Sequence, residues 1–122
     1  MSLKDKVVLV TGSGAGIGAA IAVAMAEAGA TVVTADIDGD AAQKTADTAG
    51  EFQNRTLALQ ADVRSLADID RMVETAVGEF GRLDVIVNNA GVTRKAFIMD
   101  LTEEDWDRIH SVNAKGVFFC LQ

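Results

Sequence analysis

The stretch TGSGAGIG at residues 11–18 contains glycines whose spacing suits the binding of a phosphate. It joins KVVLVTG, a β-branched run predicted as a buried strand, to IGAAIAVAMAEAGA, a run of small helix formers. Side chains at Gly12 or Gly16 would hold a phosphate away from the backbone N–H groups, and a Cβ at Gly18 would push the helix off the strand. A plain tight turn is the alternative, but the position between a strand and a helix favours a dinucleotide-binding loop.

Asp36 supplies a second part of such a site, because it lies at the end of the next predicted strand, TVVTADI, about 20 residues after the glycines. A carboxylate there can accept hydrogen bonds from the hydroxyl groups of an adenosine ribose, and it would repel the 2′-phosphate of NADP. No Arg or Lys lies in the glycine stretch or directly after Asp36 to neutralise that phosphate. The sequence therefore favours NAD over NADP, although a solvated turn acid is an alternative interpretation of Asp36.

Alternating strands and helices must position these residues. Further apolar runs predict strands at 56–63 and 83–91, and helices are predicted at 38–50, 65–81 and 102–122. Ser65 and Thr102 are predicted to cap the last two helices, each with an aspartate three residues later. Continuous apolar strands and right-handed crossovers predict an α/β fold, a Rossmann-like doubly wound parallel sheet with strand order 3-2-1-4. Residues 1–122 are expected to form a single domain.

Composition excludes several classes of function. The chain has 122 residues and a net charge of −7, which argues against a nucleic-acid or anionic-membrane surface. No apolar run approaches the roughly 20 residues of a membrane helix, and the first apolar stretch is too short for a signal peptide, so we expect a cytoplasmic protein. Cys120 and His110 are each the single residue of their type, so we expect no internal disulfide and no metal site.

Four motifs together resemble the short-chain dehydrogenase/reductase family. TGSGAGIG resembles its Thr-Gly-x-x-x-Gly-x-Gly loop, NNAG at 88–91 its second signature, ADV at 61–63 its adenine-side segment, and SVNAKG at 111–116 its helix with an active-site asparagine. The four occur in the family's order and span nearly the whole chain. The resemblance implies a Rossmann domain and hydride transfer between a nicotinamide cofactor and an alcohol or ketone.

The resemblance also implies a role for each matched residue. Along the cofactor phosphates it places Gly12, Ser13, Gly16, Ile17 and Gly18. At the adenosine it places Asp36 and Ile37 on the ribose, Asp62 on the adenine amino group and Val63 on the ring. Near the central part of the cofactor it places Asn89, Ala90 and Gly91, with Val112 close by. Asn113 would match the asparagine of the family's catalytic tetrad, which helps to order a water for a proton relay.

Structural alternatives exist for several of these residues. Asp62 could cap or hydrogen-bond the loop after its strand. Asn88 and Asn89 could tie their strand to its neighbours. Asn113 is locally unfavourable inside a helix and, close to Gly116, could mark a bend; without its catalytic partners the bend is the favoured interpretation. The loop that contains Arg94 and Lys95 is interpreted as solvated rather than as an anionic-substrate site.

The 122 residues lack the rest of the family's chemistry. The resemblance implies a serine and a Tyr-x-x-x-Lys pair after the asparagine, whereas the sequence contains no tyrosine. We therefore expect the N-terminal half of such an enzyme, catalytically inactive by itself. A stand-alone nucleotide-binding or self-assembling half-Rossmann module, natural or engineered, is the alternative, and a gene that continues beyond Gln122 is a third hypothesis. The resemblance implies that substrate selection depends mostly on loops after the later strands of the family.

The predicted strand at 83–91 would be a long, hydrophobic sheet edge, and the helix at 102–122 would lack neighbours over its apolar face. We expect such surfaces to associate, so the sequence predicts a homodimer or higher oligomer through this edge and the last helix.

Overall fold

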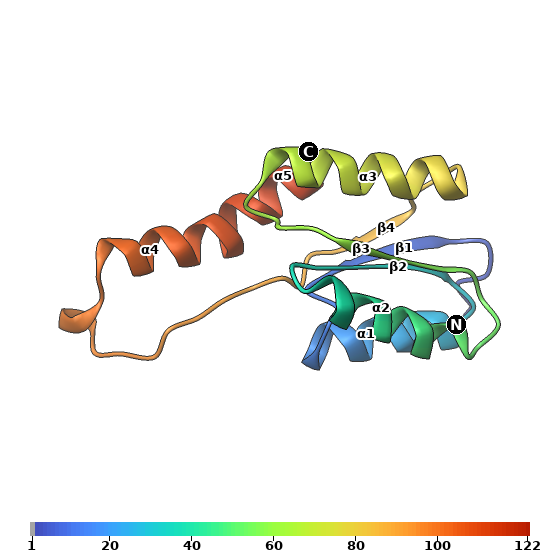
Figure 1. Ribbon diagram of the computed structural model, residues 1–122, viewed down its shortest axis with the longest axis horizontal. Coiled ribbons are helices and arrows are strands. Elements are labelled where there is room, and N and C mark those ends of the chain that lie inside the picture. Colours follow the sequence, from blue (N-terminus) through green and yellow to red (C-terminus); the bar gives the residue numbers. More distant parts are fainter. Residues whose placement is uncertain (1) are drawn as a thin grey trace.

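A computed structural model describes residues 2–122, which form a four-stranded parallel sheet with helices on both faces (Figure 1). The strands are β1 (Val7–Thr11), β2 (Thr31–Asp36), β3 (Thr56–Gln60) and β4 (Val85–Val87). The helices are α1 (Gly16–Glu27), α2 (Gly39–Gly50), α3 (Leu66–Phe80), η1 (Ile98–Asp100), α4 (Glu103–His110), η2 (Ser111–Gly116) and α5 (Val117–Leu121). The sheet order β3-β2-β1-β4 confirms the predicted order and the Rossmann-like class.

Alternate side chains of β1 point to two separate apolar layers. Val8 and Val10 pack with Ala22 and Ala26 of α1, so α1 and α2 cover one face of the sheet. On the other face, Leu9 belongs to a cluster with the apolar side of α3 and with α5 (Figure 1). Because both faces are covered, β1 and β2 consist of almost continuous buried residues, as expected of central parallel strands.

The helix caps follow the predicted positions, with one difference. The Thr102 hydroxyl accepts a hydrogen bond from the Asp105 N–H, and the Asp105 carboxylate accepts one from the Thr102 N–H, which completes a capping box. Ser65 likewise accepts from the Asp68 N–H at 3.2 Å. The carboxylate of Asp68, however, accepts from the N–H of Asp62 at 2.9 Å, so it holds the loop after β3 instead of closing a box.

Strand β4 is shorter than predicted, because it pairs with β1 only over Val85–Val87. Beyond β4, the N–H groups of Asn89 and Ala90 donate to a side chain and not to the backbone of β1. The Thr11 hydroxyl oxygen accepts from Asn89 at 3.2 Å and from Ala90 at 3.1 Å. The prediction of a long edge strand over 83–91 was therefore wrong, since a side chain of β1 takes over the backbone donors that would continue the ladder.

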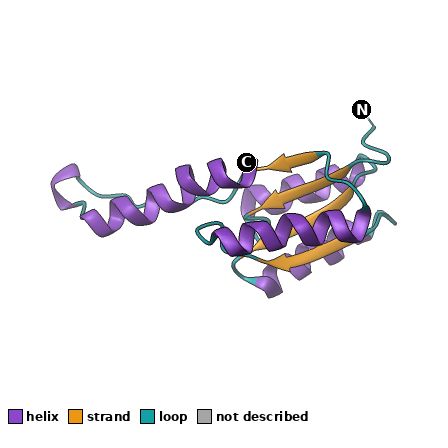
Figure 2. Cartoon of the chain, turned by 90° about the horizontal axis from the view of Figure 1, so that it is seen from above, coloured by secondary structure: helices purple, strands orange, loops and turns teal. Residues whose placement is uncertain are grey.

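The predicted continuous helix at 102–122 is divided into α4, the π-helical turn η2 and α5. α5 lies beside α3, whereas α4 extends away from the sheet (Figures 1 and 2). A Cβ on Gly116 would lie 3.0 Å from the Val63 side chain, so η2 passes very close to the end of β3. In consequence the predicted common apolar face is split: Val112 and Cys120 are buried, but Trp106 on α4 is 64% exposed. No helix within residues 2–122 is both long and apolar enough to span a membrane.

Candidate functional site

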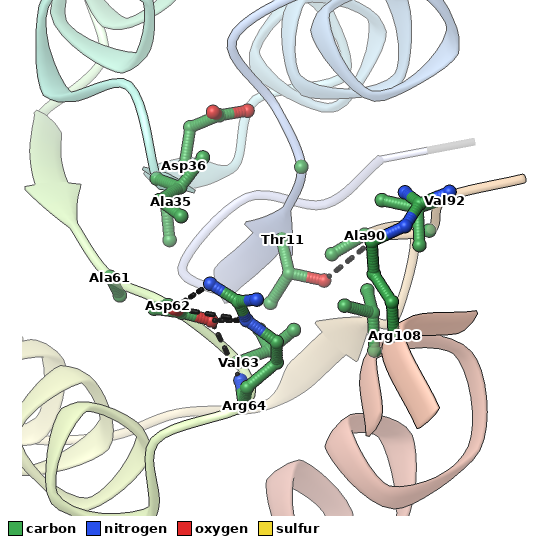
Figure 3. A pocket seen from close by; sticks show the side chains of 14 residues that line it. Thr11, Ala35, Asp36, Ala61, Asp62, Val63, Arg64, Ala90, Val92 and Arg108 are labelled. Atoms are coloured by element: carbon green, nitrogen blue, oxygen red, sulfur yellow. Dashed lines mark hydrogen bonds and ion pairs between the residues drawn. The ribbon is translucent and has the colours of Figure 1, made fainter. Parts of the chain in front are cut away.

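A cavity of about 310 Å³ opens at the carboxyl ends of the strands, the edge of a parallel sheet where ligands bind in open α/β folds (Figure 3). The predicted cofactor residues that line it are Gly12, Asp36, Ile37, Asp62, Val63, Ala90, Gly91 and Val112. Arg64 and Arg108 line it as well, and the sequence motifs predicted no role for either. The adjacency of Arg64 to the ADV motif was the signal that could have identified it.

The glycine loop packs directly against the segment that follows β4. Gly12 has a φ of 63° and lies so near that segment that a Cβ on it would meet the Ala90 Cα at 2.8 Å. A Cβ on Gly18 would collide with the Gly12 carbonyl oxygen and the Asn89 side chain. Two glycines are therefore required by close packing of the loop, whatever it binds.

Helix α1 begins without a side-chain cap. Its N-cap residue is Ala15, and its first turn contains no acidic residue, whereas α2, α3 and α4 each begin with a capping side chain. Gly16 has a φ of 56°, and nothing lies within 4 Å of the position a Cβ would take. Ile17 beside it is 75% exposed. The first N–H groups of α1 are thus open to an anion, which the helix dipole would favour.

Ser13 is fully buried and joins the glycine loop to β2. Its hydroxyl donates to the Ala35 carbonyl at 3.2 Å and accepts from the Ala35 N–H at 2.9 Å. The Ser13 side chain therefore lies behind the glycine loop, and only its backbone is left to contact the phosphates along which the resemblance places this residue.

Asp36 holds the glycine loop from the other side. Its Oδ2 accepts from the Gly14 N–H and its Oδ1 from the Asp38 N–H, both at 2.9 Å. Each carboxylate oxygen has two acceptor directions, so both keep one for a further donor. Gly14 admits this contact, since a Cβ on it would lie 2.9 Å from the Asp36 carboxyl carbon. Asp36 therefore anchors the glycine loop and still has acceptor directions to which hydroxyl groups could donate.

Asp62 is bonded to Arg64 by four contacts (Figure 3). Its Oδ1 accepts from the Arg64 backbone N–H at 2.9 Å and from Nε at 3.0 Å, and its Oδ2 accepts from Nη2 at 2.7 Å and from Nε at 3.1 Å. The guanidinium hydrogen bonds hold the pKa of the Asp62 carboxyl below its usual value. The loop-bonding alternative for Asp62 is thus realised in this structure.

Asn89 lies behind the cavity and connects β4 to the glycine loop. Its side-chain amide donates to the carbonyl oxygens of Thr11 at 3.2 Å and Gly12 at 3.1 Å. Ala90 and Gly91, which follow it, line the cavity. This placement gives Asn89 the structural role that the sequence left open for it.

Asn113 lies in η2 and is exposed. Its Oδ1 accepts from the Val92 N–H and its Nδ2 donates to the Val92 carbonyl, each at 2.8 Å. The residue before it, Val112, is buried and lines the cavity. Asn113 therefore coincides with a change of helix type and also fixes the loop after β4 at the cavity rim.

Comparison with known proteins identifies the group to which this arrangement belongs. Residues 6–122 match the family model described as short chain dehydrogenase. The chain belongs to the short chain dehydrogenase family. This family binds a nicotinamide cofactor, and a solved structure similar to this chain is complexed with NADH.

Individual relatives place the chain within the first part of the family domain. It is 41% identical to a (hydroxy(phenyl)methyl)succinyl-CoA dehydrogenase subunit from Thauera aromatica over 100% of its own length and 49% of the relative's. It is 40% identical to a 3-oxoacyl-acyl-carrier-protein reductase from Thermotoga maritima, over 97% and 48% of the two lengths. The chain thus spans about half the length of the curated relatives it matches.

Solved structures of the family agree with the fold in detail. A 3-ketoacyl-(acyl-carrier-protein) reductase from Brucella melitensis, complexed with NADH, superposes with a TM-score of 0.92 at 40% identity, over 98% of this chain and 48% of that one. A short-chain type dehydrogenase/reductase from Mycobacterium marinum superposes with a TM-score of 0.95 at 36% identity, over 99% and 48%. The four strands and their helices therefore form the N-terminal half of a short chain dehydrogenase.

Proposed function

We propose that residues 1–122 are the NAD-binding half of an oxidoreductase that transfers a hydride between a nicotinamide cofactor and an alcohol or ketone. The observation that carries the proposal is the uncapped N-terminus of α1 next to the cavity lined by Asp36 and Asp62. An open helix end attracts phosphate, and the Asp36 carboxylate keeps acceptor directions for ribose hydroxyl groups.

Different residues of this half would contact different parts of the cofactor. The phosphates would lie at the glycine loop, against the backbone of Gly12, Gly16, Ile17 and Gly18, with Ser13 supporting the loop from behind. The adenosine would lie on Asp36, Ile37, Asp62 and Val63. Ala90, Gly91 and Val112 would flank the middle of the cofactor, with Asn89 supporting that wall. The half-exposed apolar side chain of Ile37 would then be covered by the bound nucleoside.

The preference for NAD over NADP rests on charge. The negative charge of Asp36 would repel the 2′-phosphate of NADP and weaken its binding, whereas the ribose hydroxyl of NAD carries no charge to repel. Arg64 and Arg108 are the cations that line the cavity. The Arg64 guanidinium is engaged with Asp62, and that of Arg108 donates to the Thr93 carbonyl. We therefore expect NAD to bind more tightly than NADP.

Hydride transfer requires groups that these residues do not supply. The bound nicotinamide provides the hydride donor or acceptor, and a general acid/base must move the proton of the substrate oxygen. In the family this group is a tyrosine, and the sequence contains none. What this half contributes is binding, orientation and, through Asn113, the position of the loop after β4. We propose that residues 1–122 are inactive by themselves.

Calorimetry with NAD and NADP tests the binding half of the proposal. Asp36→Ala should weaken NAD binding about 10-fold, because one charge-assisted hydrogen bond is worth about 1.5 kcal/mol. Asp40→Ala, which removes an exposed acid from the same helix–strand region, is the matched control and should change little. Equal binding of NAD by Asp36→Ala and the wild type would contradict the assignment, and steady reduction of NAD with a secondary alcohol would contradict the proposed inactivity.

A second proposal concerns assembly. Phe97, Ile98 and Met99 in and beside η1 are 84%, 82% and 89% exposed, and β4 pairs only with β1 among the described strands. Contiguous exposed apolar residues and a free sheet edge favour association, so we propose that the chain forms a homodimer or larger assembly through β4 and the α4–α5 region. Light scattering that gives a monomer at micromolar concentration would contradict this.

A further inference from the structure

The Asp62 carboxylate, which the proposed function assigns to the adenine amino group, already accepts hydrogen bonds on both of its oxygens. A carboxylate offers about four acceptor directions, two on each oxygen. Arg64 brings three N–H groups to it: the backbone N–H and Nε–H contact Oδ1, and Nη2 contacts Oδ2, which shares the same Nε–H. Both oxygens are engaged, so an adenine amino group that binds Asp62 must compete with the guanidinium.

We propose that the Arg64 side chain is an internal competitor of the adenine base for Asp62 and thereby sets the affinity and base preference of the site. This inference rests on the proposed function. Its basis is that both residues line the same cavity and that their contact is inside it rather than on a remote surface (Figure 3).

The exposure of the pair makes the exchange possible. The side chain of Arg64 is 45% exposed and that of Asp62 27%, so the guanidinium can move into water without breaking a buried contact. Its hydrogen bonds go to a neighbour only two positions away along the chain, and Asp62 keeps the backbone N–H of Arg64 after the side chain has left. Exposed ion pairs of this kind contribute little to stability, so their loss is a modest cost that a bound base can offset.

Competition of this kind depends on the exocyclic group of the purine. Adenine presents an amino donor, which needs the carboxylate free. Hypoxanthine presents a carbonyl acceptor at the same place, which a carboxylate repels and a guanidinium can donate to. Arg64 should therefore penalise adenine and favour hypoxanthine, and its removal should increase the discrimination between the two bases.

The test compares AMP with IMP, which carry the same phosphate and ribose, by calorimetry on the full chain. In Arg64→Met, which keeps the apolar stem, the ratio of AMP to IMP affinity should rise about two- to fivefold over the wild type. Arg64→Lys keeps the charge but cannot bridge both carboxylate oxygens, so its ratio should also rise. Using the ratio removes the general effect of a lost cation on an anionic ligand.

A spectroscopic readout follows Arg64 directly. The Arg64 Nε–H signal in an ¹H–¹⁵N spectrum should be shifted in the wild type relative to Asp62→Asn, and saturating AMP, but not IMP, should move it toward the Asp62→Asn position. A ratio that falls in Arg64→Met, or one that stays constant while AMP leaves the Nε–H signal unmoved, overturns the inference while the proposed function stands. Absence of AMP and NAD binding in every variant overturns the proposed function, and the inference with it.

Discussion

The side-chain amide of Asn113 exchanges two hydrogen bonds with the backbone of Val92, both 2.8 Å long. The pair joins η2 to the loop after β4 across 21 positions of sequence and sits beside Val112 in the cavity wall. An amide is the one neutral side-chain group that can donate and accept in this way, so neither aspartate nor leucine could reproduce it.

Asn113→Ala should lower the free energy of unfolding by about 1 kcal/mol, because two partly exposed hydrogen bonds are lost. The local effect should be larger: the Val92 amide should exchange with solvent markedly faster. Hydrogen exchange by mass spectrometry and urea titration measure both. Lys115→Ala, an exposed neighbour in the same π-helical turn, is the control; equal behaviour of the two variants would show that the amide pair contributes nothing.

Gly18→Ala should destabilise the fold by about 1–3 kcal/mol, because its Cβ would enter the space of the Gly12 carbonyl and the Asn89 amide. Gly78→Ala is the matched control. Nothing lies within 4 Å of a Cβ on Gly78, which sits inside α3, so this change should stabilise the chain by about 0.5–1 kcal/mol. Thermal unfolding should show a lower melting temperature for Gly18→Ala and a higher one for Gly78→Ala than for the wild type. A Gly18→Ala variant as stable as the wild type would contradict the close packing around Gly18.

Ser13→Ala should cost about 1–3 kcal/mol, since it leaves the buried N–H of Ala35 without the hydroxyl oxygen that accepts from it at 2.9 Å. Thr48→Ala removes a hydroxyl that bonds the Lys44 carbonyl on the exposed side of α2, and it should be nearly neutral. Chemical denaturation compares the two. Ser13→Ala as stable as Thr48→Ala would show that the loop does not depend on this bond.

Acid should weaken the start of β1 through Asp84. Hydrogen bonds from the Arg82 guanidinium, and then from the Val7 N–H, lower the pKa of the Asp84 carboxyl. A depressed folded-state pKa means that this stabilisation is complete above the unfolded value of about 3.9 and is lost as the pH falls through the folded value. Asp84→Asn should therefore be less stable than the wild type near neutral pH, and the difference should shrink on acidification below about pH 4. A difference that is constant with pH would contradict the role of the charge.

Periodicity and end signals predicted most of the fold. The strand order and the caps at Ser65 and Thr102 were correct because continuous apolar runs, capping residues and right-handed crossovers act locally or by general rule. The length of β4 and the division of the last helix could not be predicted in this way. Both depend on contacts between distant segments, Thr11 with Asn89 in one case and Gly116 with Val63 in the other.

Topology also explains why several of the predicted site residues line one cavity. The positions at strand ends, such as Asp36 and Asp62, line the cavity because topology alone brings strand ends together. The directions of side chains could not be predicted from the sequence: Ser13 points into the protein, and Arg64 bonds to Asp62. The spacing of residues along the sequence does not determine either direction, because each depends on which hydrogen-bond partner lies nearby in the folded chain.

The contact between the glycine loop and the segment after β4 has a consequence for recombination. The Asn89 side chain packs against Gly12 and Gly18 so closely that neither glycine has room for a Cβ, although Asn89 and Gly12 are 77 positions apart. Two homologous genes crossed between these segments would combine a loop from one parent with an asparagine segment from the other. Chimeras with a crossover in that interval should therefore survive only when both parents carry the same residues at these three places, whereas a crossover after Gly91 leaves the unit intact.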